Sequence, residues 1–181
     1  AMYRAKEGGR DRAEMFDDHL RAQAVRRHSV EQTLRSALEN NRIEVHFQPV
    51  VRISDGSVVG AEALARIRTT EGELLQPIEF IDIAEDSGLI ADLGSQVLTI
   101  AFQRVSRWSK EANKPFSMAV NVSARQLADP AFPTLVSEAL TSNNLDPQQV
   151  ALEFTESALI AANPVTEQVL GELTELGIRM G

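Results

Sequence analysis

The stretch Gly60-Ala61-Glu62-Ala63-Leu64-Ala65-Arg66 decides the fold class of this 181-residue chain. Small apolar residues alternate with longer side chains at a period of two, which is the period of a β-strand. Glu62, Leu64 and Arg66 therefore share one face of the strand, and the alanines between them share the other. We expect this strand to cover 58–67, with polar groups placed among residues that are otherwise suited to burial.

The residues before this strand predict that it is the second arm of a β-hairpin. Ser54-Asp55-Gly56 is typical of a turn, because aspartate and glycine tolerate the backbone angles that turns require. Before the turn, Ile43, Val45 and Phe47 alternate with polar residues, as a first strand would. Pro49 has no backbone N–H to donate, so it either limits that strand or places it at a sheet edge.

After the hairpin, helical and extended patterns alternate to the end of the chain. Apolar residues recur at helical spacing in three segments, and short apolar runs lie between them. The expected helices cover 93–108, 133–140 and 165–176, and the expected strands cover 117–122, 150–154 and 178–180. This order predicts an α/β fold with a parallel sheet covered by helices. Four strands and the start of a fifth form an unfinished sheet, which suggests a fragment of a larger domain.

The residues that precede the hairpin have a different character. Residues 1–17 are too few to bury a core, so we interpret them as the remnant of a preceding domain. Residues 18–27 are polar and suit a connecting helix. Ser29 and Gln32 have the spacing of a capping box, which predicts that an amphipathic helix follows over 30–40.

Composition excludes several classes of protein. The chain carries 18 basic and 26 acidic side chains, a net charge of −8, which argues against wrapping a DNA or RNA duplex. A phosphate substrate remains compatible if cations lie between it and the carboxylates. No segment has the ~18 uninterrupted apolar residues of a membrane span, and there is no cysteine, so we expect a cytoplasmic location without membrane contact.

Polar residues interrupt three apolar strands of the predicted sheet. Glu62, Asn121 and Glu153 each lie within a strand, where an unpaired carboxylate would be costly to bury. Ligands of parallel α/β folds bind at the carboxyl ends of the strands, and these oxygen donors suit magnesium, manganese or calcium. The spacing alone leaves two readings open, a divalent-metal site and ordinary ion-paired or solvated side chains.

Four segments, taken in order, resemble motifs of the EAL domain, a family of bacterial phosphodiesterases that act on cyclic di-GMP. The segments are Gln48-Pro49-Val50, Glu62-Ala63-Leu64-Ala65-Arg66, Asn121-Val122-Ser123-Ala124-Arg125-Gln126-Leu127 and Glu153-Phe154-Thr155-Glu156. Four ordered motifs are far more specific than the tripeptide Glu-Ala-Leu alone. The resemblance runs from about residue 43 to the end and corresponds to roughly the first half of such a domain.

The resemblance implies a fold and a division of the chain. The family fold is a (β/α)8 TIM-like barrel whose first strand is antiparallel to its neighbour, here truncated after about half of the barrel. Ala1-Met2-Tyr3-Arg4-Ala5-Lys6 and the residues after it resemble the end of a GGDEF (diguanylate cyclase) domain. We therefore expect a GGDEF remnant at 1–17, a helical linker at 18–40 and the N-terminal half of an EAL domain at 41–181.

The resemblance also assigns roles to individual residues. Glu62, Asn121 and Glu153 would be ligands of two Mg²⁺ or Mn²⁺ ions, and the two glutamates would thereby be catalytic. Gln48 and Arg66 would contact the dinucleotide, with Arg66 at a phosphate. Glu156 would stabilise a loop that organises the metal site and a homodimer contact. The family reaction is hydrolysis of one phosphodiester bond of cyclic di-GMP, which yields linear pGpG.

An alternative within the same resemblance is a degenerate EAL domain that binds cyclic di-GMP as a receptor or interaction module without cleaving it. The paired aspartates of the family's next strand, and its later lysine, glutamate and glutamine, do not occur in this sequence. We therefore expect the chain by itself to be inactive. Because all motif residues present here are intact, the phosphodiesterase is the preferred interpretation for the parent protein.

Overall fold

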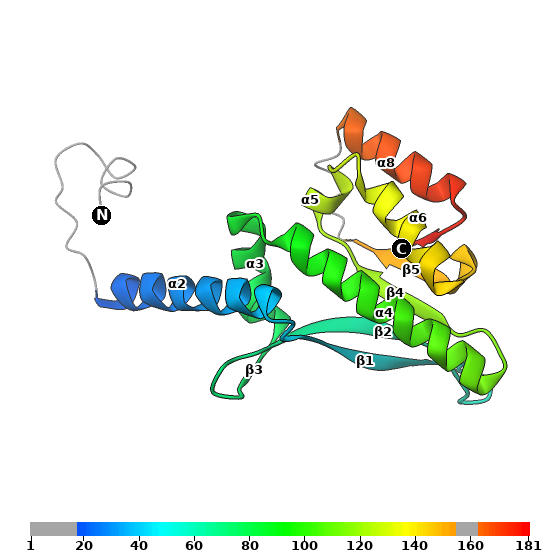
Figure 1. The fold of residues 1–181 in the computed structure, drawn as a ribbon, viewed down its shortest axis with the longest axis horizontal. Helices are drawn as coiled ribbons and strands as arrows, with labels where there is room; N and C mark the ends of the chain where they lie inside the picture. Colours follow the sequence, from blue (N-terminus) through cyan, green and yellow to red (C-terminus); the bar gives the residue numbers. More distant parts are fainter. Residues whose placement is uncertain (1–17, 155–162) are drawn as a thin grey trace.

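The computed structural model describes residues 18–154 and 163–181. Helices and strands alternate along most of this length (Figure 1). In chain order they are α2 (Asp18–Glu39), β1 (Ile43–Val51), β2 (Val58–Arg68), β3 (Leu74–Leu75), α3 (Pro77–Ser87), α4 (Ile90–Ala112), β4 (Ser117–Asn121), α5 (Ala124–Leu127), α6 (Phe132–Asn143), η1 (Pro147–Gln149), β5 (Val150–Glu153), α8 (Pro164–Glu175) and β6 (Arg179–Met180).

One mixed sheet organises the fold, and its strands follow the order β1-β2-β4-β5-β6, with β3 paired to β2. β1 and β2 are antiparallel, whereas β2–β4, β4–β5 and β5–β6 are parallel. The predicted hairpin and the α/β class are confirmed. Pro49 lies in β1, which pairs with β2 alone among the described strands, so the proline occupies an edge strand as expected.

Helices cover one face of the sheet. In Figure 1, α4 lies along the strands, and it contacts β1, β2 and β4 while α6 packs against α4. The strand residues that face the helices are almost fully buried, namely Ala61, Ala63, Met118, Val120, Val150 and Leu152. The residues between them in the strands are more exposed, and they include Glu62 and Glu153. The pleat of the strands thus separates an apolar, helix-covered face from a face that carries polar side chains.

The predicted connecting helix and the amphipathic helix after it form one continuous helix, α2. Its first half extends away from the sheet in Figure 1, and residues 21–29 are exposed. Its second half buries Val30, Leu34 and Ala37 in the core. Two ion pairs, Arg26–Glu79 at 3.1 Å and Arg27–Asp86, also join α2 to α3. The predicted remnant at 1–17 lies outside the described residues.

The sequence pattern did not predict α3. A local signal exists, because Pro77 opens the helix and the Glu79 carboxylate accepts a hydrogen bond from the Gln76 N–H at 2.9 Å. However, the helix buries only Phe80 and Ala84, which are too few positions for a helical period to emerge. Short elements such as α5 and η1 were missed for the same reason.

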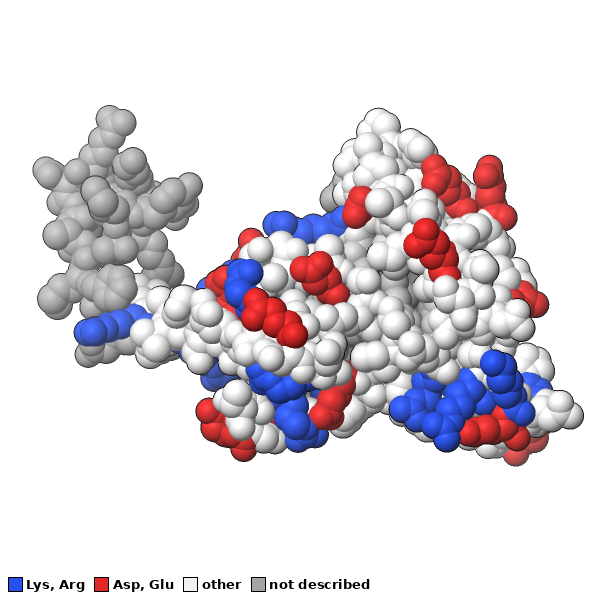
Figure 2. Space-filling view, in the orientation of Figure 1, with Lys and Arg blue, Asp and Glu red and all other residues white. Residues whose placement is uncertain are grey.

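Trp108 packs at the edge of the core rather than in its centre. Its ring meets the Phe47 ring edge-on at 5.0 Å, and the Arg104 guanidinium lies over both rings. Arg104 belongs to a set of exposed cations on the C-terminal half of α4 and just beyond it, where Figure 2 shows Lys and Arg gathered at one end of the molecule. The remaining members are Arg107, Lys110 and Lys114. Within the described residues, no helix is both long and apolar enough to cross a membrane.

Candidate functional site

Glu62 and Asn121 are in direct contact on the face of the sheet away from the helices. The Asn121 side-chain amide donates a hydrogen bond to Glu62 Oε1 at 2.8 Å. In the parallel pairing of β2 with β4, Glu62 lies beside Ala119, two residues before Asn121 on the same face. The two side chains therefore meet diagonally across neighbouring strands, near the carboxyl end of β4.

Glu153 extends this pair to the next strand. It is the register partner of Asn121 in the parallel pairing of β4 with β5, so both side chains leave the sheet on the same face. The Glu153 carbonyl accepts a hydrogen bond from the Val122 N–H at 2.7 Å, which holds the ends of the two strands together. The structure thus places the three predicted metal ligands on three adjacent strands.

The predicted substrate residues lie on the same face of the hairpin. Gln48 is directly opposite Glu62 in the antiparallel register, so its side chain emerges beside that carboxylate. Arg66 is four residues after Glu62 on β2, roughly 13 Å along the strand, and its Nη1 donates to the Ala65 carbonyl at 2.7 Å. Glu156 lies outside the described residues.

Glu44 is a nearby carboxylate that is paired with Arg68. It lies opposite Arg66 in the hairpin, but its two oxygens accept hydrogen bonds from Arg68 at 2.5 and 3.0 Å. Hydrogen bonding from Arg68 lowers the pKa of Glu44. His46 is exposed and has its Nε2 3.6 Å from Glu44 Oε2. Glu44 and Arg68 thus form an ion pair beside the site.

A hydrogen-bonded turn follows Asn121, and its residues were not among the predicted site residues. Ser123 Oγ accepts the Gln126 N–H at 3.3 Å, while Gln126 Oε1 accepts the Ser123 N–H at 3.1 Å. This is a capping box at the start of α5, with the Ser-x-x-Gln spacing that the sequence shows at Ser29 and Gln32. At Ser29 and Gln32, however, the same spacing lies inside the continuous helix α2, so the capping box predicted there is wrong and the spacing alone does not mark a helix start.

The family model described as "EAL domain" matches residues 31–181. This chain belongs to the EAL domain family. The match begins inside α2 and includes every described residue of the candidate site.

Two relatives of the EAL chain match almost all of it. An "Uncharacterized signaling protein" of Caulobacter vibrioides is 39% identical over 99% of the chain, and "Cyclic di-GMP phosphodiesterase PdeR" of Escherichia coli is 35% identical over 99%. The chain spans only 22% and 27% of the length of these two proteins. Both are therefore much longer than the region compared.

A solved structure, "PaMucR Phosphodiesterase, c-di-GMP complex", has the same fold as the EAL chain. It is 32% identical, with a TM-score of 0.78 over 84% of this chain and 62% of that one. The mixed sheet with an antiparallel first pair thus corresponds to the TIM-like architecture of EAL structures over most of the chain.

The donors of the EAL chain fit a hard divalent cation. Within residues 18–154 and 163–181, no group of three or more His, Asp or Glu side chains is arranged to hold a metal ion. The candidate set is instead two carboxylates and one amide, and all three supply the oxygen ligands that Mg²⁺ and Mn²⁺ prefer.

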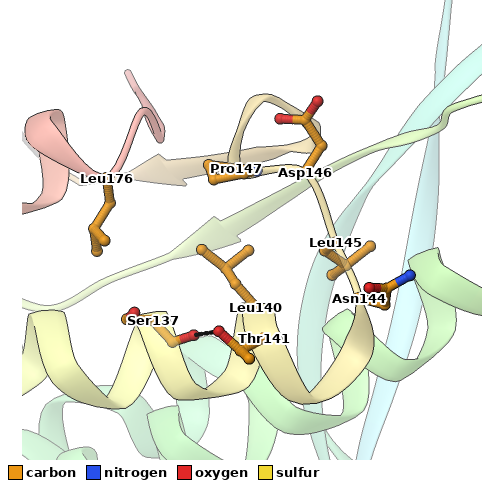
Figure 3. Close-up of a pocket in the computed structure, with 8 residues that line it drawn as sticks. All are labelled: Ser137, Leu140, Thr141, Asn144, Leu145, Asp146, Pro147 and Leu176. Carbon is orange, nitrogen blue, oxygen red and sulfur yellow. Dashed lines mark hydrogen bonds between the residues drawn. The ribbon is translucent and has the colours of Figure 1, made fainter.

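A separate hollow of the EAL chain lies away from these residues. Figure 3 shows this hollow, of about 540 Å³, between α6, η1 and the end of α8. Leu140, Asp146 and Leu176 are among the residues that line it, and the Asp146 carboxylate accepts a hydrogen bond from the Gln148 N–H at 2.9 Å. Because η1 immediately precedes β5, this hollow is at the opposite end of the strand from Glu153. It is not the candidate site.

Proposed function

We propose that this chain forms part of a cyclic di-GMP phosphodiesterase, which cleaves one phosphodiester bond to give linear pGpG. The observation that carries the proposal is the contact between Glu62 and Asn121 with Glu153 in register beside them. The similarity to PdeR and to the PaMucR complex supports the choice of substrate. The proposed hydrolysis is an activity of the whole protein, because the chain spans only 22% and 27% of the length of the two relatives.

Glu62, Asn121 and Glu153 would hold two Mg²⁺ or Mn²⁺ ions. Such ions supply charge neutralisation at the phosphate and lower the pKa of a bound water. Glu62 and Glu153 would contribute the negative charge that retains the cations, while Asn121 adds a neutral oxygen donor. The Asn121–Glu62 hydrogen bond at 2.8 Å fixes the orientation of one carboxylate before any ligand arrives.

Removal of divalent metal tests this proposal directly. The full-length protein should convert cyclic di-GMP to pGpG with Mg²⁺ or Mn²⁺, and EDTA should abolish the conversion until the metal is restored. Chromatographic separation of the two nucleotides gives the measurement. Cyclic di-GMP binding without any pGpG would instead identify a receptor and reject the enzyme assignment.

Gln48 and Arg66 would bind and orient the dinucleotide along the hairpin. Gln48 beside Glu62 can donate and accept hydrogen bonds, and the Arg66 guanidinium suits a phosphate oxygen. Their positions on the same face as Glu62 support a substrate that extends along β2.

Arg66→Ala should weaken cyclic di-GMP binding by about 10- to 100-fold, because a hydrogen bond to a charged group contributes about 1.5–3 kcal/mol. Calorimetry with Ca²⁺ in place of the catalytic metal would measure the Kd without turnover. Arg68→Ala is the matched control, since Arg68 is paired with Glu44 and should leave the Kd unchanged. Equal effects of both variants would contradict the assignment of Arg66.

The proposal extends to the organisation of the parent protein. We assign 1–17 to the end of a GGDEF domain, 18–40 to a linker and 41–181 to the first half of the EAL barrel, in a cytoplasmic protein that dimerises through the EAL domain. The relatives match 99% of the chain, which includes residues before the EAL match at 31 and so supports a longer shared arrangement. Glu156 would stabilise the loop near the site and the dimer contact.

A further inference from the structure

Gly94 on α4 is packed against the side chain of Gln126 on α5. A Cβ atom at position 94 would lie 2.7 Å from Gln126 Cδ and 2.9 Å from its Oε1, both shorter than real carbon contacts allow. The two helices are in contact at this point. Only glycine at position 94 therefore allows Gln126 to keep its place.

Gln126 has little freedom to move aside. Its side chain is buried, with 5% of the residue exposed. Its Oε1 accepts hydrogen bonds from the Ser123 N–H at 3.1 Å and from Ser123 Oγ at 3.2 Å. A new Cβ at position 94 would meet the Gln126 amide nitrogen first, and the shift of that amide would break the hydrogen bonds of Oε1, which are the side-chain half of the capping box.

The turn that Gln126 holds begins directly after Asn121. Val122 is the one residue between Asn121 and Ser123, and its N–H is held by the Glu153 carbonyl at 2.7 Å. The backbone on the C-terminal side of Asn121 is therefore fixed by the neighbouring strand and by the capping box together. The Asn121 side-chain amide that leaves this fixed backbone donates to Glu62.

We propose that Gly94 and Gln126 are positioning residues for Asn121, and that they tune the affinity of the site for its cation. Gly94 acts through Gln126, Gln126 acts through the turn, and neither touches the cation or the substrate. The effect on cation affinity rests on the proposed function, whereas the Asn121–Glu62 contact is observed in the structure. Groups that support a metal ligand from outside typically change metal affinity by about 10- to 100-fold.

The test compares two Gly→Ala variants of the full-length protein. Gly171 lies in the interior of α8, and a Cβ there would meet nothing within 4 Å. Gly171→Ala should keep the wild-type Mn²⁺ affinity and an equal or slightly raised Tm, because alanine favours a helix over glycine. Gly94→Ala should weaken Mn²⁺ binding by about 10- to 100-fold. Mn²⁺ binding is measured as the loss of the free Mn²⁺ signal in electron paramagnetic resonance. Binding that persists in the Glu62→Ala variant is subtracted, so that only the candidate site is compared.

A double-mutant cycle separates positioning from general packing. Gln126→Ala should weaken Mn²⁺ binding as Gly94→Ala does, although it adds no atoms and so avoids a folding clash. The double variant should be no worse than Gln126→Ala, because alanine at position 94 harms the site only through the Gln126 side chain. Additive losses, or wild-type affinity in Gln126→Ala, would overturn the inference.

A second readout does not depend on metal binding. Crystal structures of Gln126→Ala and, where it folds, Gly94→Ala should show the 2.8 Å Asn121–Glu62 hydrogen bond broken. If the wild-type protein binds no Mn²⁺, the metal assignment of the proposed function fails, and this distance still decides the positioning role. An unchanged distance in Gln126→Ala would overturn that role.

Discussion

Glu62→Gln should reduce hydrolysis of cyclic di-GMP by at least about 100-fold and leave the fold intact. The substitution keeps the shape of the side chain, and its amide oxygen can still accept the hydrogen bond from Asn121. It removes the negative charge that the cation needs. Loss of a residue that only hydrogen-bonds to a metal ligand typically lowers activity by about 10- to 100-fold, so loss of a direct ligand should lower it by at least the upper value. Initial rates of pGpG release by the full-length protein give the measurement.

Glu44→Gln is the matched control for this variant. Glu44 is a carboxylate on the same sheet face, but it is bonded to Arg68 rather than directed at Asn121. Its removal should cost an exposed ion pair, worth about 0–1 kcal/mol, and leave turnover near the wild-type value. Turnover by Glu62→Gln at the rate of Glu44→Gln would show that Glu62 is not a ligand.

Phe102→Ala should cost about 3–5 kcal/mol of stability, which is the largest structural effect we expect from a single substitution. Phe102 is fully buried in the middle of α4, the helix that contacts β1, β2 and β4. The truncation leaves a cavity that the helix and sheet cannot close without moving. Hydrogen exchange of α4 and β4 peptides should accelerate by about 100-fold or more, because each 1.4 kcal/mol is a factor of ten.

Ile78→Ala provides the comparison for the core variant. Ile78 is on α3 with 90% of the residue exposed, so it contributes almost no buried surface. We expect the free energy of unfolding of the Ile78→Ala variant to stay within about 0.5 kcal/mol of the wild-type value. Similar exchange in the two variants would mean that Phe102 is not part of a close-packed core.

Much of the site could be predicted because its residues break a pattern. A strand has a period of two, so a carboxylate within an apolar strand is conspicuous, and parallel strands bring their carboxyl ends together. Glu62 and Glu153 are carboxylates within apolar strands, Asn121 and Glu153 lie at carboxyl ends, and the structure places all three residues on adjacent strands. The hairpin was equally visible, because its turn and its two alternating arms are local in sequence.

The remaining features depend on contacts that no local pattern encodes. Gly94 and Gln126 are 32 positions apart, and although Gln126 falls in a motif with capping-box spacing, nothing in that motif points to Gly94. Their dependence arises only where α4 passes α5. Likewise, α3 is fixed by ion pairs to α2 and by two buried residues, which are too few to produce a helical period.

The antiparallel pairing of β1 with β2 ties the position of Gln48 to the length of the loop at 52–57. Gln48 faces the same side as Glu62 because they are register partners across the hairpin. A slip of the pairing by one residue would turn Gln48 towards the helices and bring Phe47 or Pro49 out beside the carboxylate. An insertion or deletion between 52 and 57 that shifted this register would therefore move Gln48 away from Glu62, even though this loop lies at the opposite end of the hairpin from Arg66.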